Sequence, residues 1–115
     1  MPRVARLDSP GVLQHVIARG NEKRKIFLDD QDRRRFLDRL SHLLEDTETL
    51  CYAWSLIPNP FHLLPLPIRF KLAVLMRRLL TGYAATFNFP HRQTGHLFQN
   101  RYRLQVRLLF NSPII

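Results

Sequence analysis

The sequence predicts an α+β domain in which two helices cover one face of a four-stranded antiparallel sheet. Two segments repeat leucine and phenylalanine at the i, i+3, i+4 spacing of amphipathic helices. Four other segments are rich in β-branched and aromatic residues, as strands are. The chain has 115 residues, which is enough for one hydrophobic core, so we expect a single domain over residues 1–115.

The first half of the chain is expected to fold as strand, helix and strand. Residues 12–18, VLQHVIA, form a β-branched run typical of a strand. Asp29 or Asp30 is a suitable N-cap for a helix that runs to about Glu45, because a short acidic side chain accepts hydrogen bonds from free backbone N–H groups of the first turn. Residues 50–57, LCYAWSLI, follow as the second strand.

The third strand is expected over residues 61–64, ending near Leu64. The short connection at residues 58–59 makes it antiparallel to the second strand. Pro65 and Pro67 lack the backbone N–H that a sheet ladder needs, and this strand is expected to lie in the centre of the sheet. The prolines therefore predict an early end to the pairing.

A helix and a final strand complete the predicted domain. Over residues 69–87, apolar side chains form one stripe of a helix whose other face carries Lys71, Arg77 and Arg78. A last strand is expected within residues 97–109, where RYRLQVRLL partly alternates apolar and polar residues. The order β-α-β-β-α-β is the ferredoxin-like, split β-α-β arrangement, with both helices on one face of an antiparallel sheet.

Positive charge is concentrated in the second half of the chain. The formal net charge is +9, the pI is about 11.0, and all nine acidic residues precede residue 49. A cation-only half attracts polyanions, of which nucleic acid is the usual one, and its interleaved aromatic residues favour nucleic acid further. A solvated basic face and adhesion to anionic lipid are the alternatives.

Several classes of protein are excluded by what the sequence lacks. No apolar run approaches the roughly 18 residues of a membrane span, so no membrane partner is expected. The basic stretch MPRVARLDSPG is not followed by the apolar region of a secretory signal. The single cysteine, Cys51, allows neither a disulfide framework nor a cysteine-based zinc site, and we expect a cytoplasmic protein.

The stretch PNPFHLL, residues 58–64, places one histidine in an apolar strand between prolines. It strongly resembles the PNH-hydrophobic-HLL motif of the REP-associated tyrosine transposases and their IS200-like relatives, which carry the HUH (His–hydrophobic–His) signature. Flanking stretches resemble other segments of that family in the right order. They are GVLQHVIARGNEKRKIFLDDQDRRRFLDRL, CYAWSLIPN, MRRLLTGYAATFN and HRQTGHLFQNRYR, and together the matches cover about residues 2–103.

The resemblance implies a ferredoxin-like domain for DNA transposition and recombination by a bacterial mobile element. Such proteins bind single-stranded DNA next to a hairpin and cut it with a tyrosine that becomes linked to the 5′ phosphate. Two histidines on one side of a strand hold a divalent metal, Mg²⁺ or Mn²⁺, that polarises the scissile phosphate. His62 matches the second of these histidines, and we expect it on the sheet face opposite the helices or at the rim of that face.

Two departures from the family bear on strand cleavage. Pro60 stands in place of the first metal histidine, and one imidazole holds Mg²⁺ or Mn²⁺ poorly because these ions prefer several oxygen ligands. The nucleophilic tyrosine of the family lies in a YIHLNP-like helix after the last strand, and the sequence ends at Ile115 before any such helix. Tyr83 and Tyr102 match positions that have a structural role in the family and not the position of its nucleophile. We therefore name no catalytic residue, and we expect a weak metal site or none.

Hairpin or single-stranded DNA is the predicted partner. The candidate DNA-binding residues are the cations of the second half and one histidine, namely Arg69, Lys71, Arg77, Arg78, Arg92, His96, Arg101 and Arg103. Three functions remain open: a DNA-nicking transposase, a catalytically inactive DNA-binding remnant, and an RRM-like RNA-binding domain, although no stretch matches the aromatic RNP motif. A homodimer also remains open. His91 is either a phosphate contact or an exposed histidine, while His15 and His42 need no functional account.

Overall fold

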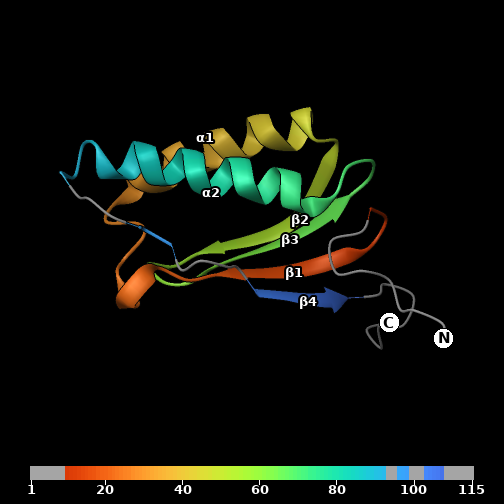
Figure 1. The fold of residues 1–115 in the computed structure, drawn as a ribbon, viewed down its shortest axis with the longest axis horizontal. Coiled ribbons are helices and arrows are strands. Elements are labelled where there is room, and N and C mark those ends of the chain that lie inside the picture. The colour runs from red at the N-terminus through yellow and green to blue at the C-terminus, as the bar shows by residue number, and fades with distance from the viewer. Residues whose placement is uncertain (1–9, 93–95, 99–102, 108–115) are drawn as a thin grey trace.

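The protein folds as an antiparallel sheet with two helices against one of its faces (Figure 1). The structure is a computed structural model that describes residues 10–92 and 96–98 and the backbone of residues 103–107. In chain order the elements are β1 (Leu13–Ala18), the 3-10 helix η1 (Asn21–Lys23), α1 (Asp30–Asp46), β2 (Thr49–Leu56), β3 (Phe61–Pro67), α2 (Leu72–Asn88) and β4 (Arg103–Arg107). The predicted α+β class, with two helices and an antiparallel sheet, is confirmed.

The strands lie side by side in the order β2-β3-β1-β4, and each neighbouring pair is antiparallel. Each long helix connects two strands that are not adjacent, as in the ferredoxin-like arrangement. β3 therefore lies inside the sheet between β2 and β1, and β2 forms one edge. A register shift between Cys51 and Trp54 interrupts the pairing of that edge strand with β3.

β3 is longer than the sequence predicted. It continues to Pro67, so the expected end near Leu64 is wrong. The Pro67 carbonyl accepts a hydrogen bond from the Gly11 N–H at 2.6 Å, so the backbone of Pro67 points its hydrogen-bonding groups toward the β1 side. Pro65, two residues earlier in the strand, has the same orientation. The β1–β3 register ends at Leu63 on that side. The β2–β3 pairing needs no N–H from either proline and continues through Pro67.

Two other boundaries also differ from the prediction. α2 begins at Leu72 instead of residue 69, because the N-cap residue Lys71 still has extended backbone angles. β4 covers Arg103–Arg107, and before it Phe98 forms an isolated bridge to Gly20. The other parts of the predicted last strand, residues 99–102 and 108–109, lie outside the described residues.

The start of α1 follows the capping chemistry that the sequence predicted. Asp29 is the N-cap, and its carboxylate accepts a hydrogen bond from the Asp32 N–H at 2.9 Å. Phe36, Leu40 and Leu43 follow on the buried face of the helix. Neither α1 nor any other helix of the described residues is long and apolar enough to cross a membrane.

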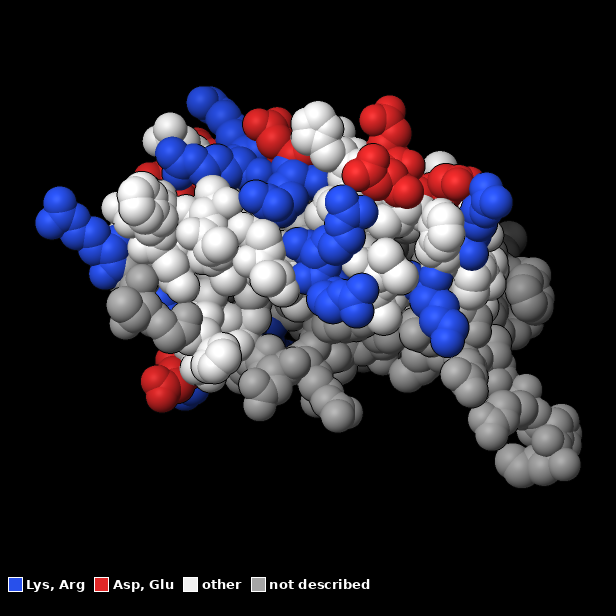
Figure 2. All heavy atoms as spheres, turned by 45° about the horizontal axis from the view of Figure 1, so that its top comes forward, with Lys and Arg blue, Asp and Glu red and all other residues white. Residues whose placement is uncertain are grey.

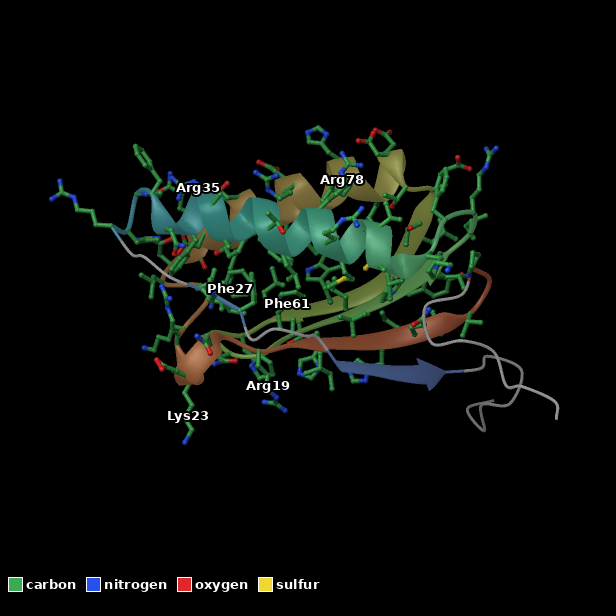
Figure 3. All side chains as sticks on the ribbon, viewed as in Figure 1. Arg19, Lys23, Phe27, Arg35, Phe61 and Arg78 are labelled. Carbon is green, nitrogen blue, oxygen red and sulfur yellow. The ribbon has the colours of Figure 1, made fainter. Side chains whose placement is uncertain are left out.

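The core lies between the helices and the sheet and is built around aromatic side chains (Figure 3). The Phe61 ring of β3 lies 4.8 Å from the Phe36 ring of α1, and Phe36 lies 5.3 Å from both Phe27 and Tyr83. Edge-to-face pairs of this kind contribute about 0.5–1.5 kcal/mol each beyond burial. The four rings join the first strand-to-helix connection, both helices and β3 into one unit.

One buried polar side chain generates a stability prediction. Gln14 of β1 is fully buried (0% exposed), and within the described part of the chain neither atom of its amide has a hydrogen-bond partner. An unsatisfied buried polar group costs about 1–3 kcal/mol. Gln14→Met should therefore raise the free energy of unfolding by about 1–3 kcal/mol in urea denaturation.

Gln31→Met, at an exposed position of α1, is the matched control and should change the free energy of unfolding by less than about 0.5 kcal/mol. Loss of stability in Gln14→Met would show that the Gln14 amide stabilises the fold.

Candidate nucleic-acid interface

His62 lies on the open face of the sheet, opposite the helices. Along β3, Phe61 and Leu63 are buried in the core, whereas His62 and Leu64 are only partly buried and point to the other side. Pro60 directly precedes β3 and lies two residues before His62. The structure thus places His62 on the sheet face where the family resemblance led us to expect it.

A second histidine lies against His62, although the sequence indicated no role for it. His15 of β1 is two residues from Ile17, which is directly opposite His62 in the β1–β3 register. The Nε2 of His15 is 2.9 Å from the Nδ1 of His62, within hydrogen-bond distance. Their rings are stacked, with centroids 5.1 Å apart and 25° between the planes. The strand pairing therefore builds a two-imidazole cluster from residues 47 positions apart.

The histidine pair lines a shallow concavity of about 350 Å³ on the open face. Ser55 of the edge strand β2 lines it as well and is directly opposite His62 in the β2–β3 register. Trp54, the next residue, also borders it, but Trp54 is opposite the buried Leu63, so its half-exposed indole (54%) is on the helix side of the sheet. The concavity thus offers two imidazoles and a hydroxyl, groups that hydrogen-bond to phosphates.

Arg19 adds a positive charge next to this concavity. It directly follows β1, four residues after His15, so the alternation of side chains puts it on the same side of the sheet as His15. Its side chain points away from the helices in Figure 3. Burial, followed by the charges of His15 and Arg19, lowers the pKa of His62 below its usual value of 6.5. The His62 imidazole is therefore neutral at physiological pH and keeps a lone pair. Arg19 was missed from the sequence because it belongs to the first half of the chain, where the acids are.

The described residues around His62 do not suit Mg²⁺ or Mn²⁺, the ions that the family resemblance implies. Both ions prefer several oxygen ligands in octahedral geometry. No aspartate or glutamate lies on any strand, and Pro60 has no lone pair to offer. Within the described ranges, no three histidine, cysteine or acidic side chains come together as a possible metal site. These residues support no chemical step through a magnesium or manganese ion.

The predicted DNA-binding cations do not gather around the histidine pair. Arg77 and Arg78 are exposed on α2, on the helix side of the molecule. Arg78 forms an ion pair with Asp46 of α1 at 3.3 Å, and Arg69 forms one with Glu48 at 3.4 Å. Both pairs are solvent-exposed, so they add little stability, but they neutralise part of the positive charge on this side.

The remaining predicted candidates lie toward the two ends of α2 or beyond the described side chains. Lys71 is exposed before α2, and Arg92 and His96 are exposed after it. Arg101 lies outside the described residues, and only the backbone of Arg103 is described, in the pairing of β4 with β1. The structure therefore distributes the candidates along the molecule and does not assemble them into one site.

Most of the described acidic residues belong to the helix layer. They lie on α1 and its flanks, at Asp29, Asp30, Asp32, Asp38, Glu45, Asp46 and Glu48, while Glu22 lies in η1. Figure 2 shows basic and acidic side chains next to one another over the helices. A polyanion that approaches the helix layer meets both signs of charge, whereas the four described strands themselves carry no acidic residue.

His91 has a structural contact that the sequence did not reveal. Its Nε2 is 2.8 Å from one oxygen of the Asp32 carboxylate and 3.0 Å from the other. Asp32 is 1% exposed and also accepts a hydrogen bond from the Leu28 N–H at 2.8 Å. The His91 side chain is itself only 19% exposed, so the expectation of an exposed histidine is wrong. The contact ties the segment after α2 to the start of α1.

The described tyrosines do not place a nucleophile in the concavity. Tyr83 is buried, and its hydroxyl donates to the Ile26 carbonyl at 2.7 Å. Burial, and then the negative charge of Asp32, raises the pKa of the Tyr83 phenol far above its usual value of 10, which keeps it protonated and weakly nucleophilic. Tyr52 of β2 is half exposed (53%) but does not line the concavity. Tyr102 lies outside the described residues.

No family model and no curated relative matches the sequence. Among solved structures, the fold is similar to that of a REP-associated tyrosine transposase bound to a REP hairpin, with a TM-score of 0.71 and 15% identity over 93% of this chain and 62% of that one. It is also similar to a candidate transposase from Deinococcus radiodurans R1, with a TM-score of 0.66 and 17% identity over 91% of this chain and 83% of that one.

These similarities confirm, at the level of the fold, the resemblance to transposases that the sequence motifs predicted. This chain spans less than two thirds of the length of the REP-associated transposase.

The buried carboxylate of Asp32 generates the prediction for this region. Asp32→Ala removes the acceptor for the Leu28 N–H and the partner of His91, and should lower the free energy of unfolding by about 1–3 kcal/mol. Asp38→Ala, at an exposed position of the same helix, should change it by less than about 0.5 kcal/mol. Thermal or urea denaturation measures both. Equal stability of the two variants would mean that the Asp32–His91 contact is not part of the folded state.

Proposed function

We propose that this chain is a transposase-type domain that binds hairpin or single-stranded DNA, with the open face of the sheet as the contact surface. The observation that carries the proposal is the cluster of His15, His62 and Arg19 on a sheet whose strands carry no acid. The similar fold of a transposase bound to a REP hairpin supports DNA as the partner class.

The charge distribution favours the open face over the helix face. The net charge of +9 attracts a polyanion over a distance, and local charges then decide where it binds. On the helix side, Asp46 and Glu48 already pair with two of the predicted cations. On the open side, Arg19 lies beside the neutral His62, and β4, which carries Arg103 and Arg107, pairs with β1.

Polar and aromatic groups along the β2 edge support a single-stranded segment as part of the ligand. Ser55 lines the concavity opposite His62, and Tyr52 and Trp54 of the same edge strand are each about half exposed, with Trp54 on the helix side of the edge. Stacking of a base on an aromatic side chain contributes about 1–3 kcal/mol and tolerates any base. Bases in a closed duplex are not available for stacking of this kind, whereas those of a hairpin loop or a flanking single strand are.

DNA cleavage is not part of this proposal. A transposase-type cut needs an activated phosphate and a tyrosine placed in line with it. The described residues do not suit Mg²⁺ or Mn²⁺, and the described tyrosines are buried or lie away from the histidine pair. We propose a DNA-binding domain in which binding does not depend on cutting.

RNA binding by an RRM-like sheet is the second candidate, and one observation favours it. An RRM also stacks bases on exposed aromatic residues of its sheet, and Tyr52 and Trp54 are exposed on β2. However, β2 is an edge strand here, and Trp54 is on its helix side, opposite Leu63. The inner strand β3 presents His62 and Leu64 on the open face in place of aromatic residues. DNA therefore remains the favoured partner.

Salt-dependent binding is the first test of the proposed function. If about four or five phosphates are neutralised, log K for a hairpin with a single-stranded flank should fall with log salt at a slope of about −3 to −4. Arg19→Glu should weaken binding by about tenfold or more near 0.1 M salt and reduce the slope by about 0.7, because one phosphate contact is lost. Fluorescence anisotropy of labelled hairpin, duplex and RNA oligonucleotides measures all of these quantities.

Charge reversal on the helix layer separates the two faces. Arg77→Glu combined with Arg78→Glu should weaken binding of all sequences by a smaller factor than Arg19→Glu does, because these charges act through the field of the whole protein. Arg34→Glu, exposed on α1, is the control for the change in net charge. If the α2 variant abolishes binding while Arg19→Glu has no effect, the open face is not the contact surface. Tighter binding of RNA than of DNA would favour the second candidate.

Covalent adduct formation tests the absence of cleavage. Incubation of the 115-residue chain with labelled hairpin and Mn²⁺, followed by a denaturing gel, should give no shifted band. Pro60→His introduces a second imidazole two residues before His62 and should strengthen metal binding, but it should still give no adduct. A covalent band from either protein would contradict the proposal. Tyr52→Phe and Tyr102→Phe would then identify the residue that carries the DNA.

A further inference from the structure

We propose that a groove between α1 and α2 binds a compact phosphate group, as free phosphate or as a phosphate monoester, at the guanidinium of Arg39. The groove has a volume of about 430 Å³ and is lined from both helices by charged and polar side chains, among them Arg35, Arg39, Arg78 and Thr86. It belongs to the helix layer, whereas the histidine pair lies on the open face of the sheet. The proposal therefore does not rest on DNA binding by that face.

The side chain of Arg39 is held in position by α2. Its Nη2 donates to the Thr86 Oγ1 at 3.1 Å, and the Thr86 hydroxyl donates in turn to the Gly82 carbonyl at 3.0 Å. A Cβ atom at position 82 would lie only 2.7 Å from the Cζ of Arg39, so the guanidinium rests on the backbone of Gly82, where a larger residue leaves no room. Because the fold already orders this side chain, less conformational entropy is lost when it binds an anion.

Among the described residues, Arg39 has no acidic partner, unlike the other two arginines of the groove. Arg35 pairs with the buried carboxylate of Asp32 at 3.5 Å, and Arg78 pairs with Asp46 at 3.3 Å. The bond to Thr86 occupies one of the five N–H donors of the Arg39 guanidinium. The planar fork of a guanidinium matches two oxygens of a phosphate group. Arg39 is thus an ordered cation whose charge no acidic residue of the described chain neutralises.

The neighbouring charges restrict the ligand to a small anion. Asp38 and Asp46 also line the groove, so an extended polyanion along it would meet two carboxylates. A single phosphate group at Arg39 avoids most of this repulsion. His42, which lines the groove three residues after Arg39, lies on the same side of α1 and supplies a further donor.

Titration with sodium phosphate near neutral pH, followed by NMR, is the experiment. The amide signals of Gly82 and Thr86 and the Nε–H signal of Arg39 should shift along one saturable curve. Sodium chloride at the same ionic strength should not reproduce these shifts. Adenosine monophosphate should shift the same signals: tighter binding than that of phosphate would identify a nucleotide as the source, and equal binding would identify the phosphate group alone.

Three variants test the assignment to Arg39. Arg39→Gln should weaken phosphate binding by about tenfold or more, because charge-assisted hydrogen bonds are lost. Asp38→Asn should tighten binding at low salt and have less effect at high salt, because it removes a negative charge that lines the groove. Arg34→Gln, which removes an exposed arginine of the same helix, should stay within about twofold of the parent protein and is the matched control.

Gly82→Ala separates phosphate binding from a purely structural role of Arg39. Alanine is favoured in helices, and the added methyl group meets only the flexible end of Arg39, so the variant should fold normally. It displaces the guanidinium but keeps its charge, and should weaken phosphate binding severalfold. Shifts that chloride reproduces, equal losses in Arg34→Gln and Arg39→Gln, or unchanged phosphate binding by a destabilised Arg39→Gln would each overturn the proposal. The last result would mean that Arg39 only joins the two helices.

Discussion

The packing of Phe61 beneath the two helices is the constraint on which the open face of the sheet depends. Its ring is fully buried and lies 4.8 Å from the ring of Phe36. Because side chains alternate along a strand, this packing directs His62 to the opposite side, where the β1–β3 register brings His15 against it. A slip of one residue would turn His62 toward the helices and separate the two imidazoles. The aromatic core thus determines the chemistry of the far side of the sheet.

The same two-layer arrangement separates the charges. α1 carries most of the described acids; one of them, Asp32, is buried and holds His91, while Asp46 and the following Glu48 pair with cations of the second half. The strands carry no acid, so the open face combines His15, the neutral imidazole of His62, Ser55 and Arg19. A net charge of +9 draws a polyanion toward the whole protein, and this asymmetry favours one face for contact.

Local patterns in the sequence predicted the elements well and the contacts between them poorly. Helical periodicity and the Asp29 cap located α1 because both are short-range features. The end of β3 was wrong because the effect of Pro65 depends on which neighbouring strand its missing N–H faces. The His15–His62 contact joins residues 47 positions apart, and the His91–Asp32 contact joins residues 59 positions apart. No local pattern contains a strand register, so neither contact could be predicted.

The central claim is that DNA binds the open face formed by β1 and β3, and mapping of backbone amide NMR signals during titration with a hairpin tests it most directly. We predict that the signals of His15, Ile17, Arg19, Ser55 and His62 shift with increasing DNA, and that those of the exposed face of α2 around Arg77 and Arg78 move little. Shifts confined to α1 and α2, with unchanged signals on β1 and β3, would contradict the account.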